Sequence, residues 1–227
     1  HKGDMNVSDA GMARISTRAF LDKPVGEETI RAILEVAKFA PSGGNLQPWK
    51  VHVVNGAARD RLVDTVKRAV ADNPFANEGE IAVYPEKLWD PYRARRFEVG
   101  EAMYALLGIP REDKPARLMN LARNFEFFGA PAGLFFSLDR RFDRGQWAHL
   151  GMLMQTIALV AVEKGLATCM QEAWVTRART VSEFLGLGPD DQLYCGMALG
   201  WPDPQAPVNK LRSERARLEE FVTFVSE

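Results

Sequence analysis

The segment 146–163 constrains the fold of this chain more than any other. Between residues 147 and 162 its only polar side chains are His149, Gln155 and Thr156. A helix that is apolar on all sides lies either at the centre of a core or in a large interface. At about 16 residues, the apolar stretch is shorter than the roughly 20 residues that a membrane span requires. We therefore expect a core helix that also contributes to a subunit interface.

The composition excludes several classes of protein. The chain has 227 residues, of which 46% are hydrophobic and 26% charged, as in an ordinary globular protein with a sizeable core. The formal net charge is −1, so no basic excess indicates a nucleic acid as partner. Two cysteines, Cys169 and Cys195, are too few for a disulfide framework and fit a reducing compartment. Without a signal-peptide pattern at the N-terminus, we expect a cytoplasmic protein that is not bound to a membrane.

The chain is expected to form one domain. Residues 1–4 resemble a remnant of cloning, because Met5 looks like a natural start. Residues 5–227 contain no internal repeat and no linker long enough to divide them.

Helical and extended patterns alternate along the chain. Helices are expected at 27–40, 57–71, 92–107, 111–128, 146–163 and 176–185. Strands are expected at 49–54, where Val51 and Val53 share one face, and at 133–138, 166–170 and 193–199. The stretch 72–91 reads as a long loop or lid. Long helices mixed with strands indicate an α+β or α/β layer fold.

Several common catalytic chemistries lack their residues. The sequence has no phosphate-binding P-loop, no dinucleotide-binding Gly-x-Gly-x-x-Gly after a strand, and no Gly-x-Ser-x-Gly nucleophile elbow. No group of histidines, cysteines and carboxylates has the spacing of a zinc site. Cys169 lies in a predicted buried strand and is interpreted as a core residue. His52 and His149 are interpreted as packed or interface residues.

Three short segments remain that can bind a ligand. Residues 14–18, Arg-Ile-Ser-Thr-Arg, place two guanidinium groups and two hydroxyls close together, and residues 210–212, Lys-Leu-Arg, add two cations. Each cluster alone is typical of a solvated surface, but together they can bind one phosphate. Residues 41–49, Pro-Ser-Gly-Gly-Asn-Leu-Gln-Pro-Trp, contain paired glycines that allow a ligand close to the backbone. A simple helix-to-strand connection is the alternative.

The order of these segments resembles the FMN-dependent nitroreductase family. The resemblance continues through 124–131, Asn-Phe-Glu-Phe-Phe-Gly-Ala-Pro, the apolar helix, and 165–168, Gly-Leu-Ala-Thr. It covers nearly the whole chain from Met5. The resemblance implies an α+β, nitroreductase-like fold, with a central, mostly antiparallel sheet flanked by helices, in a domain-sharing homodimer.

The resemblance also implies that both basic segments bind FMN. The first segment would contribute Arg14, Ile15, Ser16 and Arg18. Arg14 and Ser16 would lie at the phosphate and ribityl end, and Arg18 at the pyrimidine edge, where a cation favours the reduced flavin. Lys210 and Arg212 would complete the phosphate site.

Two further parts of the cofactor site follow from the resemblance. The loop residues that match are Pro41, Ser42, Gly43 and Asn45. In the family this loop reaches the flavin from the other subunit, so two active sites would lie at the interface of a homodimer. Glu172 and Ala173 match the turn whose backbone contacts flavin N5. Ala173 stands where related proteins often have glycine, but only its backbone donor is needed.

The implied activity is a two-electron, ping-pong hydride transfer from NAD(P)H to a small nitroaromatic or quinone. None of these side chains is a nucleophile or a strong general base, which is consistent with chemistry carried by a flavin. Two alternatives remain: a reductive dehalogenase of halogenated phenols, and a flavin-binding module without turnover. The dehalogenase type uses a lid with Glu, Tyr and Lys, and Glu86, Lys87 and Tyr92 here match it poorly in order and spacing.

The lid residues leave the substrate open. Trp89, Tyr92, Arg93 and Arg95 can shape or charge a substrate site, or simply pack on a surface helix. Arginines there would favour an anionic aromatic such as a nitrobenzoate.

Overall fold

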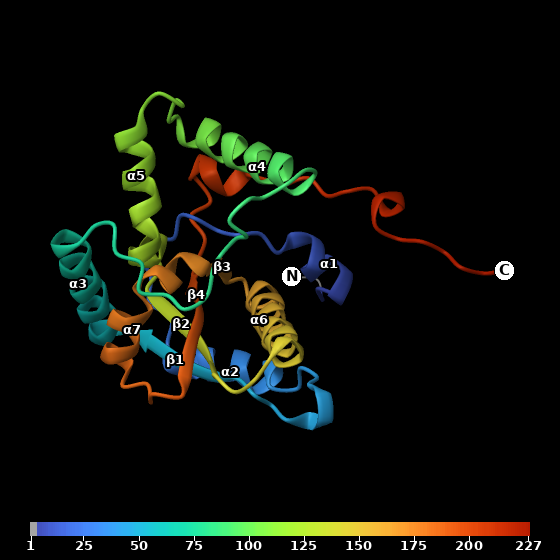
Figure 1. Ribbon diagram of the computed structural model, residues 1–227, viewed down its shortest axis with the longest axis horizontal. Helices are drawn as coiled ribbons and strands as arrows, with labels where there is room; N and C mark the ends of the chain where they lie inside the picture. Colours follow the sequence, from blue (N-terminus) through green and yellow to red (C-terminus); the bar gives the residue numbers. More distant parts are fainter. Residues whose placement is uncertain (1–3) are drawn as a thin grey trace.

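A four-stranded antiparallel sheet forms the centre of the molecule (Figure 1). The computed structural model describes residues 4–227, so the predicted cloning remnant lies outside the described residues except for Asp4. The strands are β1 (Lys50–Asn55), β2 (Ala132–Asp139), β3 (Ala167–Gln171) and β4 (Asp191–Gly200), in the spatial order β1-β2-β4-β3. Each neighbouring pair is antiparallel. The predicted α+β fold with a central, mostly antiparallel sheet is confirmed.

Helices cover both faces of the sheet, and the central strand β2 contributes apolar side chains to the core on each face. Leu134 and Phe136 point into a core shared with α2 (Glu27–Ala37) and α6 (Arg144–Glu163). Phe135 points to the opposite face, into a second core shared with α3 (Gly56–Asp72) and α7 (Ala178–Leu185). All three side chains are at most 1% exposed. The predicted core helix is therefore α6, and within residues 4–227 no helix, α6 included, is long and apolar enough to cross a membrane.

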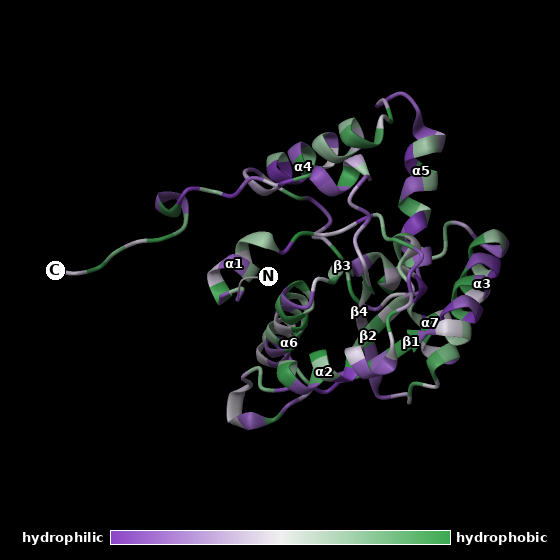
Figure 2. Ribbon diagram, turned by 180° about the vertical axis from the view of Figure 1, so that it is seen from behind, coloured by the Kyte–Doolittle hydropathy of each residue, from purple (hydrophilic) through white to green (hydrophobic). Residues whose placement is uncertain are grey.

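Three helices lie outside this two-sided core. They are α1 (Val7–Ala13), α4 (Tyr92–Leu107) and α5 (Lys114–Ala122). Short 3₁₀ turns connect the elements: η1 (Gly43–Asn45), η2 (Arg123–Gly129), η3 (Glu172–Arg177), η4 (Pro207–Lys210) and η5 (Leu218–Glu220). Helix α1 packs against α6, and α4 packs against η4. In Figure 1 the C-terminal tail extends away from the body, and Figure 2 shows hydrophobic stretches along it.

Most predicted elements are confirmed with small shifts at their ends. Helix α6 begins two residues before the predicted start, because Asp143 and Gln146 form a capping box. In it each side chain accepts a hydrogen bond from the backbone N–H of the other residue. Gly165, with φ of +81°, follows the end of the helix. The predicted helix at 176–185 begins later, at Ala178, because η3 precedes it.

The predicted helix at 111–128 is wrong in its second half. Helix α5 ends at Ala122, and η2 follows with Phe127 and Phe128 at φ of +54° and +52°. The Arg59 guanidinium, from α3, donates to the carbonyls of Glu126 at 2.7 Å and Ala130 at 3.1 Å. Hydrogen bonds from another helix thus hold this turn, and apolar spacing along the sequence cannot report them.

Strand β1 lies at the edge of the sheet, and the two valines predicted to share one face differ in burial. Val51 packs against the first core, but Val53 is 38% exposed. Val54, on the opposite face, is 3% exposed and belongs to the second core.

The stretch between α3 and α4 has no regular structure, but its first part is fixed to the body. The Glu78 backbone N–H donates to the carbonyl of Thr176 at 2.9 Å. The Glu78 carboxylate accepts hydrogen bonds from the backbone and hydroxyl of Thr180, at 2.9 and 2.7 Å. This part is therefore attached to η3 and α7.

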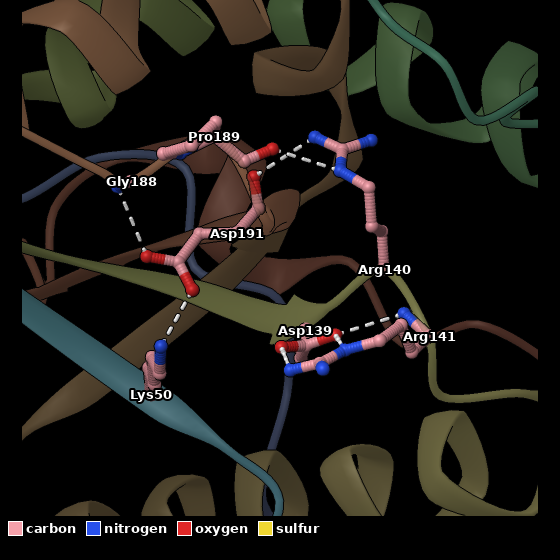
Figure 3. A network of polar contacts seen from close by, with 7 residues as sticks. All are labelled: Lys50, Asp139, Arg140, Arg141, Gly188, Pro189 and Asp191. Atoms are coloured by element: carbon pink, nitrogen blue, oxygen red, sulfur yellow. Dashed lines mark hydrogen bonds and ion pairs between the residues drawn. The ribbon is translucent and has the colours of Figure 1, made fainter.

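A polar network closes one end of the sheet (Figure 3). Lys50 of β1 donates to Asp191 of β4 at 2.6 Å, and the backbone of Gly188 donates to the same carboxylate at 3.1 Å. Hydrogen bonds from Lys50 lower the pKa of Asp191, and the reciprocal interaction raises the pKa of Lys50. Beside them Arg141 donates to Asp139 at 2.7 Å and lowers the pKa of that carboxyl.

Candidate functional site

The first basic segment runs as an extended chain beside β3. Ser16 forms a parallel bridge with Thr168, and the Thr17 backbone N–H donates to the Thr168 carbonyl at 2.9 Å. In extended backbone, alternate side chains project to opposite sides. Thr17 is directed inward, with 1% exposure, so its alternating neighbours Ser16 and Arg18 project the other way.

A cavity of about 490 Å³ lies between this segment and the C-terminal segment. Its lining includes Arg14, Ile15, Ser16, Arg18, Arg212 and Arg215. Four arginines from segments nearly 200 residues apart therefore line one cavity, together with Val99 of α4. Two of them also donate within their own segment, Arg212 to the Leu211 carbonyl at 3.0 Å and Arg215 to the Ser213 carbonyl at 2.9 Å. Guanidinium groups bind phosphate through paired N–H donors, so this lining suits a phosphorylated ligand.

Asn209 fixes the two segments relative to each other, and the sequence analysis missed it. Its side-chain oxygen accepts from the backbone N–H of Arg18 at 3.0 Å. Its amide nitrogen donates to the carbonyls of Ala19 at 2.9 Å and Asp203 at 3.0 Å. All three partners are backbone groups, so no pairing of residue types along the sequence indicates this role. Arg215 was also missed, because it resembles the rest of a charged tail.

Lys210 departs from the predicted arrangement. Lys210 is the last residue of η4, and it lines a neighbouring cavity of about 380 Å³. Arg212 lines both cavities. The chain changes direction after the 3₁₀ turn, so Arg212, and not Lys210, borders the cavity with Arg14.

The turn at Glu172 and Ala173 lies beyond the C-terminal end of β3. It begins η3 directly after the strand, about 13 Å beyond Thr168 at the usual rise of a strand. Partial burial raises the pKa of the Glu172 carboxyl. Burial, together with the nearby charge of Glu172, raises the pKa of Tyr194 in β4 to about 12.

The glycine-rich loop lies against the first turns of α6. The backbone N–H of Gly43 donates to Nδ1 of His149 at 3.4 Å. A Cβ on Gly43 would lie 3.0 Å from Cε1 of the same ring, which is why glycine suits this position. The Ser42 hydroxyl accepts from the backbone of Gln47 at 3.0 Å. His149, predicted as a packed or interface residue, is thus half-buried against the loop.

The loop and the segment 14–18 lie at opposite ends of α6 (Figure 1). The loop contacts His149 near the start of the helix, whereas residues 14–18 pair with β3, which follows its end. Helix α6 has 20 residues and is therefore about 30 Å long. One chain does not bring the predicted loop residues to the predicted phosphate residues.

The charged and aromatic residues around α4 are engaged with one another. Arg93 forms an ion pair with Asp90 at 3.1 Å, and Arg95 with Glu220 of the tail at 3.8 Å. Trp89 and Tyr92 pack edge to face at 5.6 Å between ring centroids. Both arginines therefore have acidic partners within the chain.

The three residues weighed for a dehalogenase lid are all exposed: Glu86, Lys87 and Tyr92.

Comparison with known proteins assigns the chain to a family. The model described as "Nitroreductase family" matches residues 12–201. The chain belongs to the nitroreductase family. It is 38% identical to a nitrobenzene nitroreductase of Ectopseudomonas oleovorans over 225 residues, covering 97% of each chain. It is 36% identical to a 4-nitrobenzoate reductase of Pseudomonas putida, covering 94% of this chain and 92% of the relative.

Solved structures share the fold of this nitroreductase-family chain. The FMN and NADPH-dependent nitroreductase NfnB from Sphigopyxis sp. strain HMH superposes with a TM-score of 0.95 at 42% identity, covering 98% of this chain and all of the other. The FMN-dependent NfnB from Mycobacterium smegmatis, determined in complex with NADPH, gives a TM-score of 0.91 at 32% identity, with coverages of 97% and 100%. The nitroreductase-like fold expected from the resemblance is confirmed.

Proposed function

We propose that this chain is an FMN-dependent oxidoreductase that uses NAD(P)H to reduce nitroaromatic or quinone-like acceptors by two-electron, ping-pong hydride transfer. Relatives over nearly the whole chain are named as nitroreductases, including enzymes named for nitrobenzene and 4-nitrobenzoate. The observation that carries the proposal is the cavity at which Arg14 and Arg18 meet Arg212 and Arg215. It provides a phosphate site in a protein without a P-loop.

The residues around the cavity fit FMN. Arg14, Ser16 and Arg212 would bind the phosphate and ribityl end, and Ile15 would supply an apolar contact. Arg18 would place a cation at the pyrimidine edge, which favours negative charge there. When bound, FMN supplies the centre that accepts and donates hydride.

The turn after β3 would orient the ring of the cofactor. The family resemblance implies that the backbone of Glu172 and Ala173, which begins η3 directly after β3, would contact flavin N5. Alanine suffices at position 173 because the contact uses only its backbone.

A homodimer is part of the proposal. The loop residues Pro41, Ser42, Gly43 and Asn45 lie a helix length from their own cavity, so a second copy must supply them. Large apolar side chains remain exposed in the single chain, among them Met12 of α1 at 75%, Phe39 at 80%, Leu46 at 55% and Met152 of α6 at 43%. Exposed apolar side chains of this size are typical of a subunit interface. The free, buried thiols Cys169 and Cys195 suit the cytoplasm, where we place the protein.

Anaerobic reduction tests the proposed activity. The purified protein is reconstituted with FMN and titrated with NADH or NADPH without oxygen, and its visible absorbance is recorded. We expect the flavin absorbance to bleach and then to return when a nitroaromatic or quinone is added. A protein that binds FMN but does not bleach would be a binding module instead. Recovery with halogenated phenols alone would indicate a dehalogenase.

A further inference from the structure

The segment 124–131 has no contact with the basic cavity, although it is among the most distinctive in the sequence. It forms η2 and packs against η3, the turn that begins with Glu172. The residue that joins the two turns is Gln171, the last residue of β3.

The side chain of Gln171 is hydrogen-bonded at both ends in a buried position. It is 2% exposed. Its amide nitrogen donates to the backbone carbonyl of Asn124 at 2.8 Å and to the Asn124 side-chain oxygen at 3.2 Å. Its oxygen accepts from Nε1 of Trp174 at 3.1 Å. One carboxamide therefore connects η2 to the third residue of η3.

Aromatic packing holds the same connection from behind. Trp174 is fully buried, with ring centroids 4.9 Å from Phe127 and 5.2 Å from Phe125. Gly196 of β4 admits the indole, because a Cβ there would lie 2.3 Å from Cδ1 of Trp174. Gly133 of β2 admits Phe127 in the same way, at 2.2 Å. The indole thus has little freedom to move away from Gln171.

The backbone of η2 adopts a conformation that bulky residues seldom adopt. Phe127 and Phe128 both have positive φ, which costs free energy in residues of this size and persists only where surrounding contacts enforce it. The Arg59 hydrogen bonds to Glu126 and Ala130 are two such contacts, and the Gln171 hydrogen bonds to Asn124 are two more.

We propose that Gln171 is a positioning residue for the Glu172–Ala173 turn. Its carboxamide joins η2 to Trp174 and so fixes the direction of the two backbone N–H groups between them. The effect of this turn on the flavin rests on the proposed function. The orientation of the turn by Gln171 does not depend on it. The segment 124–131 then holds the Glu172–Ala173 turn in place through Gln171.

Hydrogen exchange in the flavin-free protein tests whether Gln171 holds the Glu172–Ala173 turn in place. Gln171→Glu keeps an acceptor for Trp174 but replaces the amide donor with an oxygen that faces two Asn124 oxygens. We expect the amides of residues 172–175 to exchange about tenfold faster, which corresponds to about 1.4 kcal/mol, because both hydrogen bonds from Gln171 to Asn124 are lost. Gln205→Glu makes the same chemical change at an exposed side chain and should leave this exchange unchanged.

A pH profile of the loaded protein separates positioning from general destabilisation. Below the pKa of the introduced carboxyl, its O–H can donate to Asn124 again, so Gln171→Glu should recover near-wild-type flavin potential and exchange at low pH. Above the pKa of the introduced carboxyl, the flavin potential and the amide exchange rates of the variant should both differ from those of the wild type. The wild type and Gln205→Glu should lack this extra step.

Asn124→Ala keeps the inference testable if Gln171→Glu does not fold. It removes the side-chain acceptor of Gln171 at 3.2 Å and the hydrogen bond that the Asn124 amide donates to the Leu121 carbonyl, while the backbone acceptor at 2.8 Å stays. It should accelerate the exchange of residues 172–175 by a smaller factor, about threefold. Folded variants with wild-type exchange of this turn would overturn the inference. Faster exchange in a protein that binds no FMN would instead leave the positioning intact and contradict the proposed function.

Discussion

At the residue scale, side chains with a distinctive chemistry could be placed from the sequence, and their backbone partners could not. Arg14, Ser16 and Arg18 line one cavity together with Ile15, and their predicted contacts with FMN stay a prediction. Asn209 escaped prediction because it binds the backbone of residues about 190 positions away. The absence of Lys210 from the lining of the larger cavity was not predictable, because Lys210 ends a 3₁₀ turn that has no strong sequence signal.

The electrostatic role of Arg18 gives a prediction for the flavin. Arg18→Ala should lower the midpoint potential by some tens of millivolts, because a charge-assisted contact contributes about 1.5–3 kcal/mol and about 30 mV corresponds to 1.4 kcal/mol for two electrons. Arg212→Ala should weaken FMN binding in both redox states and leave the potential nearly unchanged. Redox titration with FMN dissociation measured alongside distinguishes the two. Wild-type values for both quantities in Arg18→Ala would remove this residue from the site.

The close approach of Trp174 to Gly196 predicts a large loss of stability. Gly196→Ala should reduce the free energy of unfolding by about 3 kcal/mol, because the new methyl group would overlap the indole ring in a packed core. Gly100→Ala, within α4, has no atom within 4 Å of the added methyl group and should stabilise the chain by about 0.5–1 kcal/mol. Denaturant unfolding of both variants checks the pair. An equal, small effect at the two positions would contradict the packing.

At the element scale, the strands and most helices could be predicted from the sequence. Strands buried on both faces leave short apolar runs, as in β2, and helices buried on one face leave apolar residues at every third and fourth position, as in α2. The prediction was wrong where tertiary hydrogen bonds override the pattern. The second half of 111–128 is apolar at helical spacing, yet Arg59 holds it as a 3₁₀ turn with two phenylalanines at positive φ. Contacts between distant elements could not be predicted either, since nothing in the sequence of residues 41–49 indicates that this loop lies against His149.

The network at the end of the sheet predicts a loss of stability in acid (Figure 3). The pKa of Asp191 is lowered in the folded chain, so its stabilising contribution is complete above the ordinary value of 3.8 and is lost as the pH falls through the lowered value. Asp191→Asn should therefore reduce the free energy of unfolding by about 1–2 kcal/mol at pH 7 and by much less near pH 2. Thermal unfolding across pH 2–7 measures the difference.

A neighbouring residue supplies the control for this experiment. Asp190→Asn changes an exposed carboxylate and should leave the curve close to that of the wild type. A deficit for Asp191→Asn that stays constant between pH 7 and pH 2 would show that the ionised carboxylate is not what stabilises the sheet.

At the scale of the whole molecule, the proposed site requires two chains. The basic cavity and the Ser42–Asn45 loop are separated by the length of α6, and apolar residues of α1, α2 and α6 are exposed between them. The C-terminal tail adds further exposed apolar side chains, including Phe221 at 69% and Phe224 at 86%. Two copies would cover these surfaces and bring each loop to a cavity.

Sedimentation tests the proposed assembly. At micromolar concentration the protein should sediment with about twice the chain mass of 25.4 kDa. Met152→Glu, which places a charge on the outer face of α6, should shift the equilibrium toward the monomer and reduce FMN binding in parallel. A folded wild-type monomer that retains FMN would contradict the shared site.

Subunit mixing tests the central claim most directly, because it asks whether cavity and loop act across chains. One chain carries Arg14→Ala with Arg212→Ala, the other carries Gly43→Val, and the mixed dimer is isolated with two affinity tags. If each site joins the cavity of one chain to the loop of the other, one site has both defects and one has none. The mixed dimer should then bind one FMN with wild-type affinity and turn over at about half the wild-type rate. If each site lies within one chain, both sites are defective, and a mixed dimer no more active than its parents would contradict the account.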